Sequence, residues 1–160
     1  MSTMKDLTTQ LSEVVIFQGL HKTELEFILA ISSMQQFERD EVIFKEGDPG
    51  EELYLILNGK VRISRHLSGV GTGEEALAIL EPTQVFGEMA VIEDEVVRSA
   101  TATAHGPCSM LLIRKKAFQR LLRDDHHLAY TVLSNVVRLL SGRLRTTNDR
   151  VILALASGQF

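Results

Sequence analysis

The chain holds a single cysteine, Cys108, among its 160 residues, which excludes an internal disulfide framework and favours a reducing compartment. No apolar run approaches the roughly 20 residues of a membrane-spanning helix. The first ten residues also lack the apolar core of a signal peptide. We therefore expect a cytoplasmic protein with no membrane segment.

The chain also has no excess of basic over acidic residues. Lysine and arginine number 17 against 21 aspartate and glutamate residues, so the net charge is −4 and the chain as a whole is no electrostatic match for nucleic acid. Arg138, Arg143, Arg145 and Arg150 are interpreted as a solvated helix face. We expect one domain over residues 1–160, no DNA-binding domain, and no direct contact with DNA.

Metal-ligand spacings are absent from the local sequence. None of the five histidines lies at an H-x-H or H-x₃-H spacing, and His126 and His127 would point to different sides of a helix. Cys108 and Ser109 have no evident base beside them, and Cys108 is interpreted as buried packing. We expect no metal site, no catalytic residue and no enzymatic activity.

Short strand patterns fill the middle of the chain. Two helices are predicted first, over residues 7–16 and 21–33, and the period changes at Met34. Strands are then predicted near residues 41–44, 53–57, 61–64, 76–80, 99–104 and 108–113. Asn58-Gly59 is typical of a hairpin turn, and the glycines of residues 67–75 indicate a hairpin tip because no helix follows them. The fold class predicted is α+β, mainly β: a jelly-roll or double-stranded β-helix barrel over about residues 34–113.

Two helices are predicted after the barrel, over residues 115–123 and 125–155. An apolar seam in the longer helix steps by four and three residues, which favours pairing between two copies of the chain. The seam comprises Leu133, Val137, Leu140, Leu144, Thr147, Val151 and Ala154. A second stripe, Val132, Val136 and Leu139, would pack on the barrel. The alternative is a single wide face against the domain's own core.

A candidate phosphate site follows the barrel's middle strands. Gly87 lets the backbone approach an anion, and residues 88–92 can form a helical turn with free N–H groups. Arg98 offers a planar fork to two phosphate oxygens. Glu88 fits beside a phosphate ester if it accepts from a ribose 2′-hydroxyl. The alternatives are a plain turn at Gly87 and a surface salt bridge between Glu88 and Arg98.

These residues resemble a known family. Phe86-Gly87-Glu88-Met89-Ala90 with Arg98-Ser99-Ala100 is similar to the phosphate-binding cassette of cyclic nucleotide-binding domains. Residues 44–50 and 53–61 resemble that family's barrel signature, and residues 17–20 its entry segment. The likeness covers about residues 15–155 and is greatest to the sensor domain of bacterial Crp/Fnr-type regulators. It implies a regulatory domain that binds a cyclic nucleotide.

The resemblance also implies roles for individual residues. Backbone and side chains that would hold the phosphate and ribose are Gly87, Glu88, Met89, Ala90, Arg98 and Ser99. The pocket wall and base contacts would comprise Ile63, Leu77, Ala78, Thr147 and Asn148. Thr147 favours cAMP over cGMP as the ligand. The partners expected are a second copy of the chain through the last helix and an unknown downstream protein; the alternative function is an interaction or scaffold module that answers to a protein or another effector.

Overall fold

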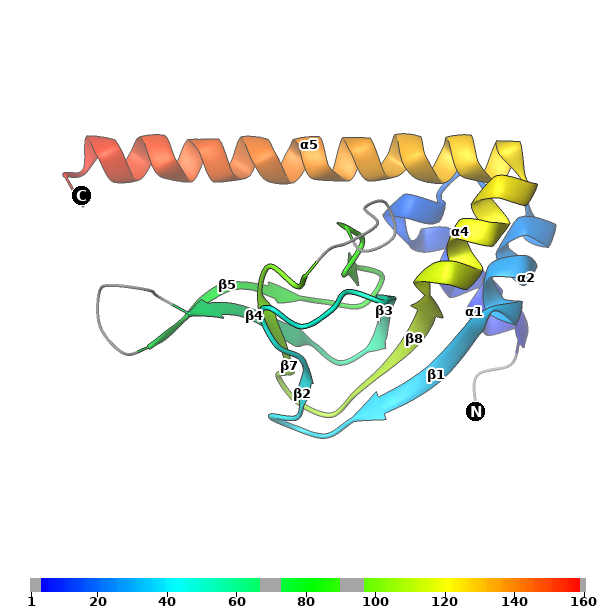
Figure 1. Ribbon diagram of the computed structural model, residues 1–160, viewed down its shortest axis with the longest axis horizontal. Helices are drawn as coiled ribbons and strands as arrows, with labels where there is room; N and C mark the ends of the chain where they lie inside the picture. The colour runs from blue at the N-terminus through cyan, green and yellow to red at the C-terminus, as the bar shows by residue number, and fades with distance from the viewer. Residues whose placement is uncertain (1–3, 67–72, 90–96, 159–160) are drawn as a thin grey trace.

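A computed structural model describes residues 4–66, 73–89 and 97–158 (Figure 1). Eight strands form two four-stranded sheets with the orders β1-β8-β3-β6 and β2-β7-β4-β5. The first sheet comprises β1 (Ser32–Phe37), β8 (Cys108–Arg114), β3 (Glu52–Asn58) and β6 (Val85–Phe86). The second comprises β2 (Val42–Phe44), β7 (Thr101–Ala104), β4 (Val61–His66) and β5 (Glu74–Leu80). The mainly β class and the jelly-roll architecture are confirmed, although the two sheets stay separate rather than closing into a continuous barrel.

The sheets face each other across an apolar core. Ile56 and Met110 from the first sheet meet Val61, Ala102 and Ala104 from the second. Alanines at alternate positions of β7 leave room for the larger side chains opposite, so the two layers approach closely. Residues on the other face of β7, such as Thr103, point away from this core.

The turn at Asn58-Gly59 differs from the hairpin that the sequence predicts. β3 pairs with β8 and β6, whereas β4 pairs with β5 and β7, so the turn carries the chain from one sheet to the other. A Cβ on Gly59 would lie 2.5 Å from the Pro107 carbonyl oxygen and from Cys108. The glycine is therefore needed for close packing of two sheet-crossing turns. β4 and β5 do form the predicted hairpin, and its tip at residues 67–72 lies outside the described residues.

Helices pack against the outer face of the first sheet. They are α1 (Met4–Glu13), the 3₁₀ turn η1 (Val15–Phe17), α2 (Lys22–Ala30), α4 (Lys115–Asp124) and α5 (His126–Ala156). Phe17, Phe118 and Val132 meet Leu53 and Ile113 of the sheet in one apolar cluster. α2 ends before the predicted residue 33 because residues 32–37 join β8 as the edge strand β1.

α5 divides into a packed half and an exposed half. The carboxylate of Asp125 accepts from the Leu128 backbone N–H at 3.0 Å and caps its first turn. Val132 and Val136 are buried and Leu139 is partly buried, so the predicted second stripe does pack on the domain. The C-terminal half extends past the helical layer as the long rod at the top of Figure 1. None of the described helices combines the length and apolar character needed to cross a bilayer.

Candidate functional site

Gly87 and Arg98 meet at the end of β6. Gly87 has a φ of +76°, a conformation that side-chain-bearing residues rarely adopt. A Cβ at this position would lie 2.6 Å from Nη1 of Arg98 and 2.9 Å from the Glu52 carbonyl oxygen. The absence of a side chain therefore lets the guanidinium lie directly against the backbone of residue 87.

Arg98 is held in place from both sides of its backbone. Its carbonyl oxygen accepts from the Gly47 N–H, and its own N–H donates to the Asp48 carbonyl, both at 2.8 Å. The turn at residues 46–50 thus fixes an arginine that follows it by about 50 positions in the chain. This turn belongs to the same barrel signature that the sequence pointed to.

The Arg98 side chain is buried, with only 5% of its surface exposed. Nη2 donates to the Glu52 carbonyl oxygen at 2.9 Å and lies 3.5 Å from the Glu52 carboxylate. The guanidinium carbon stands 4.2 Å from the centre of the Phe44 ring and 5.6 Å from that of Tyr54. Nε is buried without a hydrogen-bond partner among the described residues. The fork therefore keeps donor capacity that this chain does not use.

Burial lowers the pKa of Arg98, because removing a guanidinium from water disfavours its charged form. Nearby Tyr54 and the Glu52 carboxylate oppose this shift in pKa only in part. A bound anion would supply the missing counter-charge. The electrostatics at Arg98 thus fit a phosphate ligand.

Glu88 is buried too, but its carboxylate pairs with Arg143 of α5. Arg143 Nη2 also donates to the Val85 carbonyl oxygen at 3.1 Å. The alternative pairing of Glu88 with Arg98 is wrong, since Arg98 pairs with Glu52 instead. The residue expected to take a ribose hydroxyl is therefore tied to the last helix.

The other candidates for phosphate and ribose contacts are more exposed. Met89 is 41% exposed and lies in the expected helical turn of residues 88–92, of which residues 90–92 lie outside the described part of the chain. Ser99 is exposed one position after Arg98.

The candidate pocket wall is brought together in part. Ile63 of β4 lies directly opposite Ala78 of β5 and Ala102 of β7, so these side chains share one face of the sheet. The register shifts between Ile63 and Ser64, which leaves Leu77 as the extra residue of a β-bulge. Leu77 is 46% exposed.

Thr147 and Asn148 lie on the exposed half of α5. The Thr147 hydroxyl donates to the Arg143 carbonyl oxygen at 3.0 Å, one turn earlier in the helix. Both side chains are exposed and keep their free polar atoms on the helix surface.

The sequence interpretation missed four residues around Arg98 and Glu88. The sequence pattern predicts a solvated helix face for Arg143, yet Arg143 pairs with Glu88 and lies one helical turn before Thr147, on the same side of α5. Glu52, Phe44 and Tyr54 fall in strands, where alternation marks them as core or surface but not as guanidinium contacts. The spacing of four residues between Arg143 and Thr147 places both on one side of a helix, and this pattern could have identified Arg143 from the sequence.

An open hollow of about 560 Å³ lies elsewhere, on the outer face of the second sheet. Val42, Arg62 and Thr103 line it, and these alternate with the inward-facing Ala102 and Ala104. It contains none of the candidate nucleotide contacts. The candidate site is therefore the buried Arg98 and Gly87, not this hollow.

Comparisons with known proteins define the class. The sequence profile of the cyclic nucleotide-binding domain matches residues 34–125, which covers the sheets, α4 and the residues between them. The chain belongs to the cyclic nucleotide-binding domain family and is similar to regulators of the Crp type.

Particular relatives agree with this assignment. The chain is 36% identical over 131 residues to the "Cyclic AMP receptor protein" of Thermus thermophilus, a match that covers 81% of this chain and 57% of that protein. It is 35% identical over 112 residues to a "cAMP-dependent protein kinase regulatory subunit" of Mucor circinelloides, covering 70% and 25%. A cyclic nucleotide-binding domain from Methylobacillus flagellatus has a TM-score of 0.80 at 27% identity, covering 91% and 82%.

The chain spans 57% of the length of the Thermus protein, so that protein's full activity does not transfer with the match. Two further relatives are named as cAMP-activated global transcriptional regulators and are covered over 60% of their length. The expectation that this protein makes no contact with DNA is accordingly not supported.

Proposed function

We propose that the domain binds cAMP and that Arg98 and Gly87 hold its cyclic phosphate. The observation that carries this proposal is the buried guanidinium of Arg98, which lies against a residue with no side chain and keeps an unused Nε donor. A phosphate oxygen would accept from the fork and restore the charge balance that burial disturbs. Ser99, the next residue, would add a hydroxyl donor.

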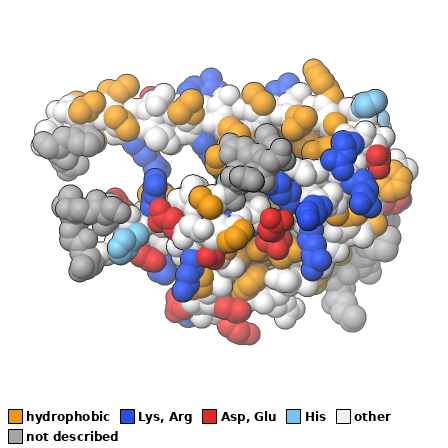
Figure 2. All heavy atoms as spheres, in the orientation of Figure 1, with side chains coloured by type: hydrophobic (Ala, Val, Ile, Leu, Met, Phe, Trp, Pro, Cys, Tyr) orange, Lys and Arg blue, Asp and Glu red, His pale blue; other side chains and the backbone are white. Residues whose placement is uncertain are grey.

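The ribose and base would lie between the second sheet and α5. Ile63 and Ala78 would form the wall on the sheet side. Thr147 and Asn148, with side chains exposed on the C-terminal half of α5, would reach the base. Figure 2 supports this arrangement, because open space separates that half of the helix from the strands below it. Thr147 and the likeness to proteins named for cAMP favour adenine over guanine.

The pairing of Glu88 with Arg143 gives the ligand a way to act on α5. A ribose 2′-hydroxyl that donates to Glu88 would compete with Arg143 for the same carboxylate. Binding would then bias α5 between two placements, and the helix would pass the signal to a second copy of the chain and to a downstream protein. A ligand with equal affinity for both placements would switch nothing.

Calorimetry with cAMP and with cGMP tests the proposal. We expect the wild-type chain to bind cAMP with a Kd of about 1 μM or tighter, equivalent to about −8 kcal/mol. Arg98→Ala should abolish most of the binding, because the phosphate loses its counter-charge inside the protein. Arg120→Gln is the matched control: it removes one guanidinium from an exposed position of α4, and the affinity should stay at the wild-type value.

Thermal melting separates this function from an interaction module of the same fold. At 100 times its dissociation constant, a ligand adds about 2.7 kcal/mol to the free energy of unfolding. An unchanged melting temperature with both nucleotides would contradict nucleotide binding. Unchanged cAMP affinity in Arg98→Ala would contradict the assigned role of Arg98.

A further inference from the structure

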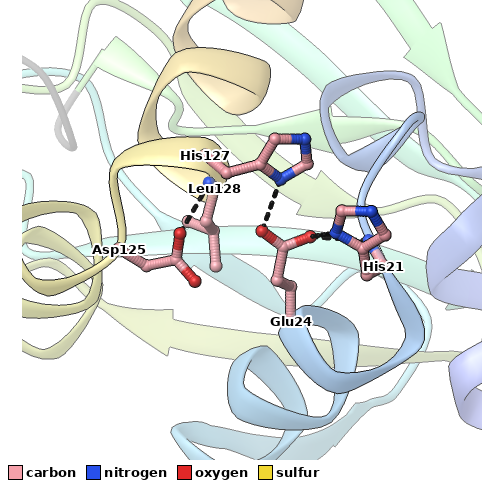
Figure 3. Close-up of polar contacts among 5 residues, drawn as sticks. All are labelled: His21, Glu24, Asp125, His127 and Leu128. Atoms are coloured by element: carbon pink, nitrogen blue, oxygen red, sulfur yellow. Dashed lines mark hydrogen bonds and ion pairs between the residues drawn. The ribbon is translucent and has the colours of Figure 1, made fainter.

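Two histidines and a glutamate converge at the junction of α2 and α5. Figure 3 shows His21, Glu24 and His127 pointing toward one another from the start of α2 and the first turn of α5. His127 Nδ1 forms a hydrogen bond with Glu24 Oε1 at 2.6 Å, and His21 Nδ1 lies 3.0 Å from Oε2, which also accepts from the His21 backbone N–H at 2.6 Å. The two imidazole rings lie with their centres 4.6 Å apart. Each carboxylate oxygen thus faces one ring nitrogen.

Glu24 is a buried carboxylate whose ion-pair partners are histidines, which carry a positive charge only when they are protonated. Only 6% of its side chain is exposed, and its ion pairs with the rest of the described chain run to the two histidines alone. Burial raises the pKa of Glu24, but the hydrogen bonds from His127 and the His21 backbone outweigh it and leave the pKa below its ordinary value. Asp125 adds negative charge nearby. Among the described residues, no lysine or arginine forms an ion pair with this buried carboxylate, so a cation bound at the junction would supply positive charge to it.

The separations of the three groups suit one metal ion. One donor atom from each residue lies within 4.8 Å of the others. Zinc bonds of about 2.0–2.2 Å in a tetrahedral shell place neighbouring donor atoms about 3.3–3.5 Å apart. To reach that spacing, the two exposed imidazoles would have to rotate, which lengthens their short contacts with Glu24 and brings the more distant donor atoms together. The His21 and His127 side chains are 71% and 50% exposed, so an ion reaches the group from solvent.

We propose that His21, Glu24 and His127 form a Zn²⁺ site that joins the N-terminal helices to the first turn of α5. Two neutral imidazoles and one carboxylate are a donor set that zinc accepts, with water in the remaining position. Zn²⁺ binds unprotonated ring nitrogens and an ionised carboxylate, so it competes with protons for these atoms and its binding weakens as the pH falls. The proposal depends only on this junction and is independent of the proposed nucleotide site.

The local sequence gave no sign of this site. His21 and His127 stand 106 positions apart in the numbering, so no H-x-H or H-x₃-H rule detects them. Spacing along the chain predicts no metal site, because His21, Glu24 and His127 do not form a local ligand pattern. Packing of α5 against the N-terminal segment creates the group.

Zinc titration of the chelator-stripped protein tests the proposal. We expect one Zn²⁺ per chain by calorimetry, and one Co²⁺ with the visible absorption of a tetrahedral site. His127→Ala should weaken Zn²⁺ binding at least about tenfold, a loss of about 1.4 kcal/mol. His126→Ala is the matched control, since it removes the exposed neighbouring histidine that lies outside the group, and it should bind as the wild type does.

The proposal is overturned by an absence of zinc binding to the wild-type chain, by equal losses in His126→Ala and His127→Ala, or by unchanged affinity in His127→Ala. Far-ultraviolet circular dichroism checks that each variant is folded. His21→Ala is the second variant, because it removes the most exposed of the three ligands and leaves α5 intact. Unchanged zinc affinity in a folded His21→Ala protein would also rule out the three-residue site.

Discussion

Gly87 is the residue on which the position of Arg98 depends. Gly87→Ala adds a methyl group 2.6 Å from Nη1 of Arg98 and 2.9 Å from the Glu52 carbonyl oxygen. The φ of +76° adds about 1–2 kcal/mol of strain for any L side chain. Arg98 is packed against Phe44, so the guanidinium moves only at the cost of that contact. We expect Gly87→Ala to lose more than about 2 kcal/mol in the free energy of unfolding, measured by urea denaturation, and to lose cAMP affinity.

Gly47→Ala is the control for backbone strain alone. Gly47 has a φ of +87°, but a Cβ there would meet no atom within 4 Å. Its loss of stability should stay near the strain value of about 1–2 kcal/mol. Equal losses at the two positions would show that the contact between residue 87 and Arg98 contributes nothing.

The proximity of Gly87 and Arg98 was predictable from the resemblance to the phosphate-binding cassette, which implies that both residues face one ligand. The pairing of Glu88 with Arg143 was not. The two residues are 55 positions apart, and both a ribose contact and a salt bridge suit a carboxylate. The local sequence shows that Glu88 can accept hydrogen bonds, but it does not show which donor lies beside it. The packing of α5 determines that this donor is Arg143.

At the level of the elements, Arg143 links α5 to the nucleotide cassette, residues 86–90 and 98–100. Arg143→Gln leaves the buried Glu88 carboxylate and the Val85 carbonyl without their donor. We expect a loss of about 1.5–3 kcal/mol in the free energy of unfolding, the range for hydrogen bonds to charged groups. Arg145→Gln, on the exposed surface of the same helix, should change stability by less than about 0.5 kcal/mol. A loss in Arg143→Gln no larger than in Arg145→Gln would contradict the link.

The sequence predicts strands where apolar and polar residues alternate or where β-branched residues are frequent. It does not predict strands that lack both features. β1 reads Ser-Ser-Met-Gln-Gln-Phe, with no β-branched residue and mostly exposed side chains. It forms a strand because its six residues pair with β8 in an antiparallel register. The turn at Asn58-Gly59 shows the same limit, since its residues specify a reversal but the pairing of β3 and β4 depends on strands far along the chain.

In the whole molecule, the two apolar stripes of α5 differ in how far they are buried. Val132 and Val136 are buried in the domain. Leu140 of the predicted seam is partly buried against the same core, but Leu133, Val137, Leu144 and Val151 of that seam are 41–63% exposed. A single wide face packed on the domain's own core would bury both stripes. The exposed seam therefore favours pairing with a second copy of the chain. The molecular mass of the protein in solution tests this.

Leu144→Glu tests this homodimer. Leu144 is 61% exposed, and a charge at the seam between two helices would have to be buried without a partner, so we expect light scattering or sedimentation to show a monomer. Leu153→Glu is the control: its side chain is 68% exposed, and nine residues later it stands about half a turn round the helix from Leu144. The wild type and Leu153→Glu should have the mass of a dimer. A monomeric wild type, or a dimer that survives Leu144→Glu, would mean that this seam does not join two chains, and the signal would then have to leave α5 by another surface.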